Sequence, residues 1–180
     1  MSVSPSVRVR IAEPTDAAAL HALAAETFAL ACPPGTTKES SDAFVAANLS
    51  EEKFTAYLAD PARVLLVASV DEVDAGYTML VDEQPTDPDV IAALSLLPTI
   101  ELSKFYLLAG FHGTGVSSAL MDATVNSARE RGAAGAWLGV NQFNPRANRF
   151  YEKHGFAQVG TKTFYLGDHP EEDFVRERAL

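Results

Sequence analysis

The sequence predicts a mixed α/β fold in which helices flank a central β-sheet. Helical patterns alternate with short apolar, β-branched runs along the 180 residues. One of these runs, Ile100–Leu108, passes through a glycine turn directly into a helical pattern, which is the layout of a strand–helix–strand crossover. Because no internal repeat or linker divides the chain, we expect a single domain over residues 1–180, with its core from about residue 7 to residue 179.

The N-terminal half is predicted to form one strand, three helices and a hairpin. Val7–Ile11 alternates apolar and basic residues, as a half-buried strand does. Apolar spacing and capping residues predict three helices, over residues 17–32, 41–49 and 51–59. Two apolar runs separated by an acidic turn predict a hairpin, Val64–Val70 with Gly76–Val81.

The C-terminal half continues the alternation after a long connection. Asp82–Thr99 is rich in Pro and Asp, has one short apolar stretch, and is assigned no role by the sequence. The strand Ile100–Leu108 is followed by a helix from about Gly115 to Glu130. This helix is predicted to end with a basic last turn followed by Gly132. The remaining predicted elements are a strand over 136–140, a short helix from Asn144, and strands over 161–166 and 174–179.

The composition of the chain argues against several classes of binding partner. The net charge of −10, from 24 acidic and 14 basic residues, argues against binding to nucleic acid or an anionic membrane, although it also serves solubility. The single cysteine, Cys32, excludes an internal disulfide and a cysteine-based metal cluster. Met1–Arg10 lacks the apolar centre of a secretory signal, and Ala17–Cys32 is too interrupted to span a membrane. We therefore expect a cytoplasmic protein; whether it forms a homodimer is left open.

The glycine turn predicts an anion site. Gly113 and Gly115 lack a Cβ, so their N–H groups can turn toward one point, and the positive end of the following helix adds to the attraction. No Lys-Ser/Thr pair follows Gly115, and Ser118 occupies the third glycine position of the dinucleotide-binding pattern. We therefore expect a pyrophosphate other than that of ATP or NAD.

Two segments together resemble a known family. Gly110–Gly115 matches the turn Q/R-x-x-G-x-G/A except at its first position, where Gly110 stands, and Asn144–Phe156 matches N-x-x-A-x-x-F-Y-x-K-x-G-F. In this order and at this separation they resemble the acetyl-CoA-dependent GNAT acetyltransferases. The resemblance implies the GNAT acyl-CoA N-acyltransferase fold, with a mixed central sheet flanked by helices. Gly110 removes one side-chain contact without removing the amide cradle.

The resemblance also implies a co-substrate site. It places the pyrophosphate of acetyl-CoA on backbone amides of the turn and the pantetheine arm along the preceding strand. The residues that it assigns to acetyl-CoA are Phe105, Leu107, His112, Gly113, Thr114, Gly115, Val116, Ser117, Asn144, Ala147 and Tyr151. His112 could alternatively act as a base. No metal is expected, because the four histidines show no close spacing.

Acetyl transfer to an amine requires a proton donor for the departing thiolate. Tyr151 matches the tyrosine of the family's helix, and a phenol with a pKa of about 10 can donate to a thiolate with a pKa of about 8.5. The alternative is that Tyr151, like its neighbour Phe150, only packs in the core.

The amine must also lose a proton before it attacks. Glu101 matches a carboxylate that some family members use through water, and the strand period places it on one face with Ser103 and Phe105. The alternative is that Glu101 only orients water or pairs with Lys104.

These expectations define a function. We expect acetyl transfer from acetyl-CoA to a primary amine, with a polyamine such as spermidine or spermine as the leading small-molecule acceptor. Short segments similar to bacterial polyamine acetyltransferases suggest this acceptor, as do acidic residues on the early helices, namely Glu26, Asp42, Glu51 and Glu52. The alternatives are an aminoglycoside, an amino acid or a protein N-terminus as acceptor, or a non-catalytic acyl-CoA sensor. A covalent route through Cys32 is disfavoured, because it lies far in sequence from both motifs.

Overall fold

The computed structural model describes residues 6–180, so the first five residues of the segment Met1–Arg10, for which no secretory signal is predicted, lie outside the described part. In chain order the elements are β1 (Val7–Ile11), α1 (Ala17–Ala31), α2 (Lys38–Asn48), α3 (Glu51–Ala59), β2 (Arg63–Val70), β3 (Val73–Val81), α4 (Pro88–Ala93), β4 (Thr99–Leu107), α5 (Val116–Glu130), β5 (Gly135–Asn141), α6 (Pro145–Lys153), β6 (Ala157–Leu166) and β7 (His169–Ala179). The predicted mixed α/β class is confirmed.

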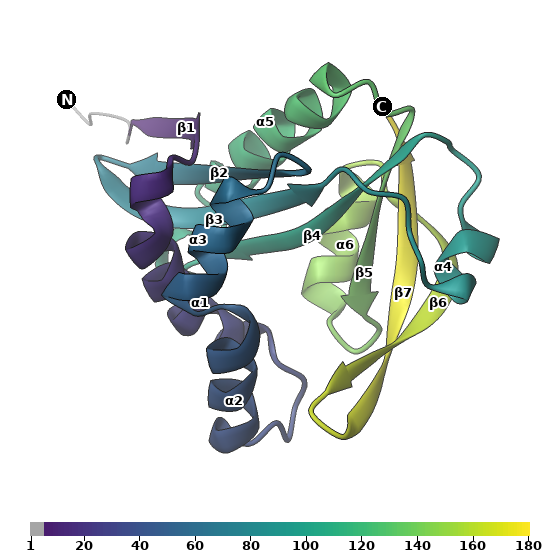
Figure 1. The fold of residues 1–180 in the computed structure, drawn as a ribbon, viewed down its shortest axis with the longest axis horizontal. Coiled ribbons are helices and arrows are strands. Elements are labelled where there is room, and N and C mark those ends of the chain that lie inside the picture. The colour runs from purple at the N-terminus through teal and green to yellow at the C-terminus, as the bar shows by residue number, and fades with distance from the viewer. Residues whose placement is uncertain (1–5) are drawn as a thin grey trace.

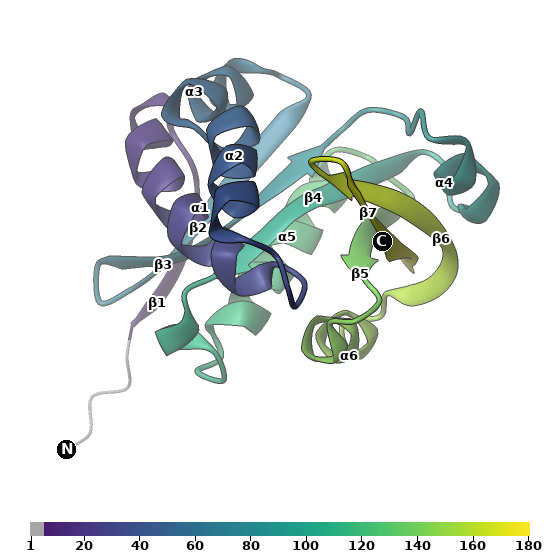
Figure 2. The same cartoon turned by 90° about the horizontal axis from the view of Figure 1, so that it is seen from below.

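Among residues 6–180, all strands belong to one sheet of order β1-β2-β3-β4-β5-β7-β6, in which only β4 and β5 run parallel. Helices α1, α2 and α3 cover one face of the sheet, and α5 and α6 lie on the other (Figures 1 and 2). Two apolar clusters form the main core. Leu20, Phe54 and Tyr77 belong to the cluster beneath α1 and α3, and Leu102, Met121 and Leu138 to the cluster beneath α5.

Strand β4 separates from β5 halfway along its length. The parallel pairing joins only Thr99–Glu101 to Gly135–Trp137. From Leu102 to Leu107 the edge of β4 that faces β5 therefore has no strand beside it within the described part of the chain. Unpaired backbone donors and acceptors at such an edge are available to a ligand.

A β-bulge in β4 changes which side chains share a face. Lys104 pairs with Met79 of β3 but Leu102 pairs with Leu80, so Ser103 is the extra residue. Lys104 lies over the ring of Tyr57 in α3, with its ammonium 5.5 Å from the ring centroid.

The bulge overturns one expectation about Glu101. Phe105 packs with the cluster beneath α5, whereas Tyr106 packs with the cluster beneath α1 and α3. Glu101 and Lys104 influence each other electrostatically, and Glu101 pairs with Val81 of the α1-side cluster. The prediction that Glu101 shares a face with Ser103 and Phe105 is therefore wrong for Phe105, because the period of two assumes an unbulged strand.

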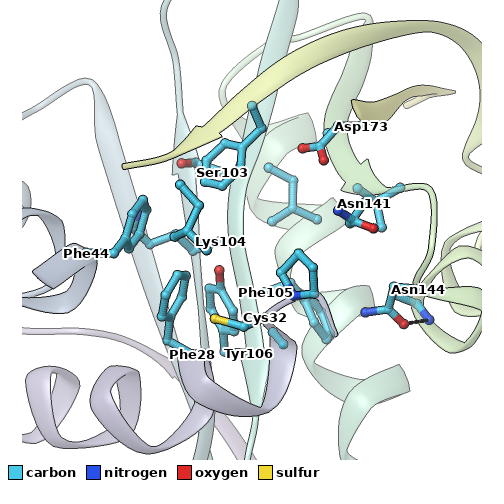
Figure 3. A pocket seen from close by; sticks show the side chains of 18 of the residues that line it. Phe28, Cys32, Phe44, Ser103, Lys104, Phe105, Tyr106, Asn141, Asn144 and Asp173 are labelled. Atoms are coloured by element: carbon cyan, nitrogen blue, oxygen red, sulfur yellow. Dashed lines mark hydrogen bonds between the residues drawn. The ribbon is translucent and has the colours of Figure 1, made fainter. Parts of the chain in front are cut away.

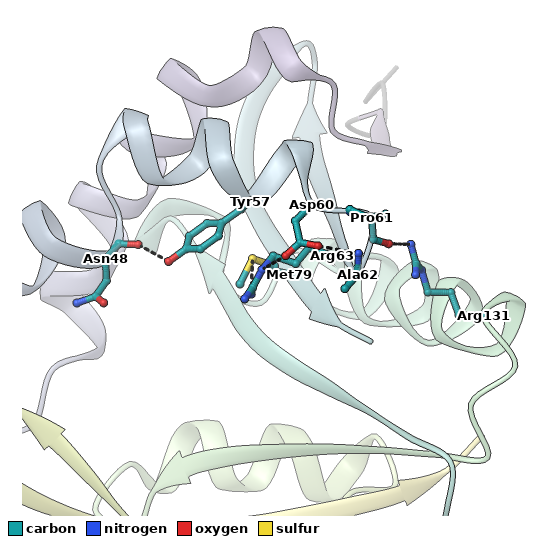
Figure 4. Close-up of polar contacts among 8 residues, drawn as sticks. All are labelled: Asn48, Tyr57, Asp60, Pro61, Ala62, Arg63, Met79 and Arg131. Carbon is teal, nitrogen blue, oxygen red and sulfur yellow. Dashed lines mark hydrogen bonds and ion pairs between the residues drawn. The ribbon is translucent and has the colours of Figure 1, made fainter. Parts of the chain in front are cut away.

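Tyr57 is itself held by polar contacts on α3 (Figure 4). Its hydroxyl donates to the carbonyl of Asn48 at 2.9 Å, and the guanidinium of Arg63 lies 5.0 Å from its ring centroid. Arg63 is fixed in turn by Asp60, whose carboxylate accepts from Nε at 3.0 Å. The surface beneath Lys104 is thus anchored to α2 and to the start of β2.

The connection Asp82–Thr99 is anchored to the sheet by β7. The carboxylate of Glu177, which is 5% exposed, accepts hydrogen bonds from the backbone N–H of Ser95 at 3.0 Å, its hydroxyl at 2.8 Å, and the N–H of Leu96 at 2.9 Å. Helix α4 lies within this connection. A buried carboxylate with several donors is a strong tether.

The last two strands are longer than the sequence predicts. β6 and β7 pair from Ala157 with Glu177 to Leu166 with His169, so they extend N-terminally beyond residues 161 and 174. Many of the added residues are polar or exposed, which removes the apolar alternation that marks a strand. Among residues 6–180, no helix combines the length and the apolar character that a bilayer crossing requires.

Candidate active site

Two cavities meet at the place where β4 and β5 separate. The sheet cavity, of about 290 Å³, lies between the ends of α1 and α2, strand β4, and strands β5 to β7. The turn cavity, of about 560 Å³, lies between α1, the glycine turn and α6. The residues that line both are Ala31, Phe105, Tyr106, Asn144, Ala147 and Tyr151. The two cavities are therefore joined at this shared wall.

The glycine turn presents unpaired amides to the turn cavity. Gly113 and Gly115 have φ angles of +77° and +86°, and a Cβ added at either would meet no atom within 4 Å. In the described part of the chain, no backbone N–H from Gly113 to Ser118 donates a hydrogen bond. Since these amides also begin the 15-residue helix α5, their arrangement suits an anion, and anion binding at this turn stays a prediction.

Most residues that the sequence assigned to acetyl-CoA line the turn cavity. They are Phe105, Leu107, His112, Gly113, Ser117, Asn144, Ala147 and Tyr151. Thr114, Gly115 and Val116 do not line it. The side chain of Val116 is fully buried in the core, so only its backbone faces the turn. Burial and the neighbouring Arg146 lower the pKa of His112, which favours the neutral imidazole.

Helix α6 aims Tyr151 at the shared wall. Asn144 caps this helix by accepting from the N–H of Ala147 at 3.0 Å, which fixes where the helix begins. The Tyr151 ring packs edge-on against Phe105 and Phe156, with centroid distances of 6.2 and 6.0 Å. Its hydroxyl makes no hydrogen bond with another group of residues 6–180, and burial, followed by the nearby Tyr106, raises its pKa.

Two carboxylates and two ammonium groups line the sheet cavity, namely those of Glu101, Asp173, Lys104 and Lys162. Within residues 6–180, none of them makes a hydrogen bond or an ion pair within 4 Å. Gly139 leaves space for two of them, because a Cβ there would lie 3.3 Å from Oδ2 of Asp173 and 3.4 Å from Cδ of Lys162. Unpaired charges at a cavity wall are typical of functional sites.

Burial shifts the pKa values of these groups. It raises the pKa of Asp173 to about 6 against the opposing effect of Lys162, and it raises the pKa of Glu101 against Lys162 and Lys104. It lowers the pKa of Lys104 to about 8, with Glu101 acting in the other direction. Each carboxylate is thus a stronger base than it is in water.

Aromatic side chains form the opposite wall of the sheet cavity (Figure 3). Phe28 and Phe44 stack with their ring centroids 4.5 Å apart, and Phe164 lies 5.8 Å from Phe44. Cys32 also lines this cavity, although it is distant in sequence from both motifs. Burial raises the pKa of its thiol, so the group is a poor nucleophile at neutral pH.

Sequence reasoning missed part of this site. Lys104 appeared only as a neighbour of Glu101, and no pattern marked Lys162 or Asp173, which β6 and β7 bring to the cavity. Conversely, the acidic residues that suggested a polyamine are exposed and line neither cavity, namely Glu26, Asp42, Glu51 and Glu52.

Comparisons with known proteins agree with this geometry. The sequence profile of the acetyltransferase (GNAT) family matches residues 25–156. A Mycobacterium tuberculosis protein named "uncharacterized N-acetyltransferase" is 48% identical over 166 residues, which cover 92% of this chain and 99% of that protein. A protein of Lactobacillus delbrueckii subsp. lactis with the same kind of name is 28% identical over 163 residues, or 88% of this chain and 89% of its own.

A solved structure supports the fold. The PaiA N-acetyltransferase of Thermoplasma acidophilum, in complex with coenzyme A, superposes with a TM-score of 0.78. The alignment covers 97% of this chain and 99% of the other, at 18% identity. At 18% identity this similarity shows a shared fold only.

Proposed function

The chain belongs to the GNAT family of acetyltransferases, and from this premise we propose that it transfers the acetyl group of acetyl-CoA to a small primary amine. The observation that carries the proposal is the junction of the two cavities at Tyr151. A ligand in the turn cavity and another in the sheet cavity meet at this wall. The side chain placed there is therefore next to the reacting atoms.

The turn cavity fits acetyl-CoA. The unpaired amides of Gly113–Ser118 and the positive end of α5 suit a pyrophosphate, and the free edge of β4 from Leu102 to Leu107 suits the amide groups of a pantetheine arm. When bound, acetyl-CoA supplies the acetyl group as a thioester. The residues of the chain hold and orient the reactants and move protons.

Tyr151 is the proposed general acid. Its raised pKa keeps the hydroxyl protonated at neutral pH, and it has no competing partner among the described residues. Burial disfavours the departing CoA thiolate as well as the Tyr151 phenolate. The sulfur of CoA therefore also becomes more basic as it gains negative charge. The hydroxyl can therefore give its proton to the sulfur as the C–S bond breaks.

Glu101 is the proposed acceptor of the ammonium proton, through a water molecule. Its raised pKa makes it a better base than an exposed carboxylate, and it shares the cavity wall with Tyr106. Asp173 is the alternative; it lies on β7, lines the same cavity and has a pKa of about 6. Glu101→Gln and Asp173→Asn separate the two, because only loss of the base lowers kcat/KM at neutral pH and moves its rise with pH up to the pKa of the free amine.

A polyamine is one candidate acceptor, supported by the overall negative charge and by the short segments similar to polyamine acetyltransferases. The carboxylates available to it inside the sheet cavity are Glu101 and Asp173. A panel of spermidine, spermine, aminoglycosides, amino acids and short peptides, read by release of free CoA thiol, tests this choice.

The decisive variant is Tyr151→Phe. We expect kcat to fall by about 10²- to 10⁴-fold, the usual contribution of a general acid, while the Kd of CoA stays within about twofold. Tyr165→Phe is the matched control, because this hydroxyl is exposed on β6 and its loss should leave kcat unchanged. Full activity in Tyr151→Phe would contradict its assigned role. A non-catalytic acyl-CoA sensor would instead bind CoA and release no thiol with any amine.

A further inference from the structure

Lys104 lines the sheet cavity and has no role in the proposed reaction. The ammonium of Lys104 faces the ring of Tyr57, and among residues 6–180 it has no carboxylate within 4 Å. Its closest electrostatic influences are Glu101, which stabilises its charge, and Arg63, which opposes it. The Tyr57 ring is a weaker partner than a carboxylate, so a half-buried ammonium here still carries a desolvation cost that an anion placed beside it would reduce.

The second lysine of the cavity is differently placed. Lys162 pairs across the β6–β7 ribbon with Asp173 and stabilises the ionised forms of both Asp173 and Glu101. Its charge is therefore shared between the two carboxylates of the cavity. Lys104 is the cation best placed to take an anion that enters from outside.

The charged side chains of the sheet cavity are complementary to a ligand that carries one positive and one negative charge. Two carboxylates and two ammonium groups line it, so a ligand with several positive charges would bring at least one of them toward Lys104 or Lys162. A ligand with one amine and one carboxylate can direct its amine toward Glu101 and Asp173 and its carboxylate toward Lys104.

The rest of the wall favours an apolar group. Phe28 and Phe44 stack as one surface, Phe164 continues it, and Tyr106 lies 6.5 Å from Phe28. The cavity, of about 290 Å³, is at the small end of ligand sites, for which about 300–1,000 Å³ is usual. A small ligand with an aromatic or aliphatic side chain fits this wall.

We propose that the acceptor is an amino acid with an apolar or aromatic side chain, whose carboxylate binds Lys104 while its amine faces the thioester at Tyr151. The inference rests on the proposed function and adds its substrate class. Lys104 lies two residues before Tyr106 on the same face of β4, about 7 Å along the strand, and its long side chain can cover the remaining distance to the carboxylate.

The test compares each amino acid with its amide, which keeps the amine and the side chain but lacks the negative charge. With acetyl-CoA and the wild-type protein, we expect kcat/KM for phenylalanine or leucine to exceed that for phenylalaninamide or leucinamide by at least about tenfold, equivalent to about 1.4 kcal/mol. We also expect both amino acids to be better acceptors than spermidine.

Lys104→Met supplies the second arm, because methionine keeps the length and apolar stem of lysine. We expect the preference for acid over amide to fall to within about twofold, mainly through a higher KM for the acid. The loss of this charge also acts on Glu101, but that effect is common to acid and amide, so the ratio of the two isolates the contact with the carboxylate. Lys53→Met, at an exposed position of α3 that lines neither cavity, removes the same charge and should keep the preference.

The outcomes separate the two proposals. Equal rates with acid and amide, or spermidine as the best acceptor, would overturn the amino-acid assignment and leave the acetyltransferase function standing. A preference that survives in Lys104→Met would overturn the role of Lys104. Absence of thiol release with every amine, while CoA still binds, would overturn the proposed function itself.

Discussion

Replacing Asp173 with asparagine is expected to stabilise the protein at neutral pH. The side chain is 8% exposed, has no hydrogen bond or ion pair within 4 Å among residues 6–180, and borders the sheet cavity. Burial raises the pKa of Asp173 from 3.8 to about 6 despite the opposing Lys162. The ionised carboxylate therefore costs folding free energy that a neutral side chain of the same shape would not.

The pKa shift of Asp173 sets the expected change in the free energy of unfolding and the pH range in which it appears. A change of about two units corresponds to about 3 kcal/mol, at about 1.4 kcal/mol for each unit. Because the pKa is higher in the folded chain, the favourable contribution is complete below about pH 3.8 and is lost as the pH rises through about 6. Asparagine resembles the protonated acid, so Asp173→Asn should gain about 2–3 kcal/mol over the wild type at pH 8 and almost nothing at pH 4.

Urea unfolding of both proteins at pH 4, 6 and 8 measures this difference. At about 2–4 °C for each kcal/mol, thermal unfolding should show a gain of roughly 4 to 12 °C at pH 8. Asp168→Asn is the control, since it removes the same charge from the exposed β6–β7 turn. If Asp173→Asn were no more stable than the wild type at pH 8, or if its advantage did not shrink toward pH 4, the argument from burial would be refuted.

Three further variants test the scaffold around the site. Glu177→Gln should cost about 1.5–3 kcal/mol and speed hydrogen exchange at Ser95, because a charged acceptor of backbone donors is lost; unchanged protection would contradict the tether. Gly76→Ala would bring a Cβ to 2.5 Å from the carbonyl oxygen of Tyr106, so we expect a loss of about 1–3 kcal/mol in thermal unfolding, and wild-type stability would exclude this close approach. Gly115→Ala should cost about 1–2 kcal/mol from its φ of +86° and weaken CoA binding in calorimetry; an unchanged Kd would argue against the cradle.

The elements that the sequence predicted well carry their signal locally. The helix of the glycine turn begins one residue from its predicted start and ends at the predicted Glu130, because glycine and capping residues mark both boundaries. Helix α2 begins three residues earlier than predicted, since Thr37 rather than a later residue caps it. The length of β6 and β7 was underestimated, because strands in a polar ribbon lack a simple apolar period.

Some residues of the candidate site could be predicted from the sequence and others could not. Glu101, Tyr151 and the glycine turn lie within motifs, so their chemistry and spacing could be recognised along the chain. Lys162 and Asp173 reach the cavity only because β7 inserts between β5 and β6, which places residues far apart in sequence side by side.

By itself the sequence determined the mixed α/β class, the glycine turn and the helix that carries Tyr151, since each depends on contacts between residues close along the chain. The tertiary structure alone decided which charged side chains line the sheet cavity. The bulge at Ser103 turned Glu101 toward Lys104, and the separation of β4 from β5 opened the cavity between them. Register and strand divergence arise from pairing between distant segments, and a pattern read along one strand does not contain that information.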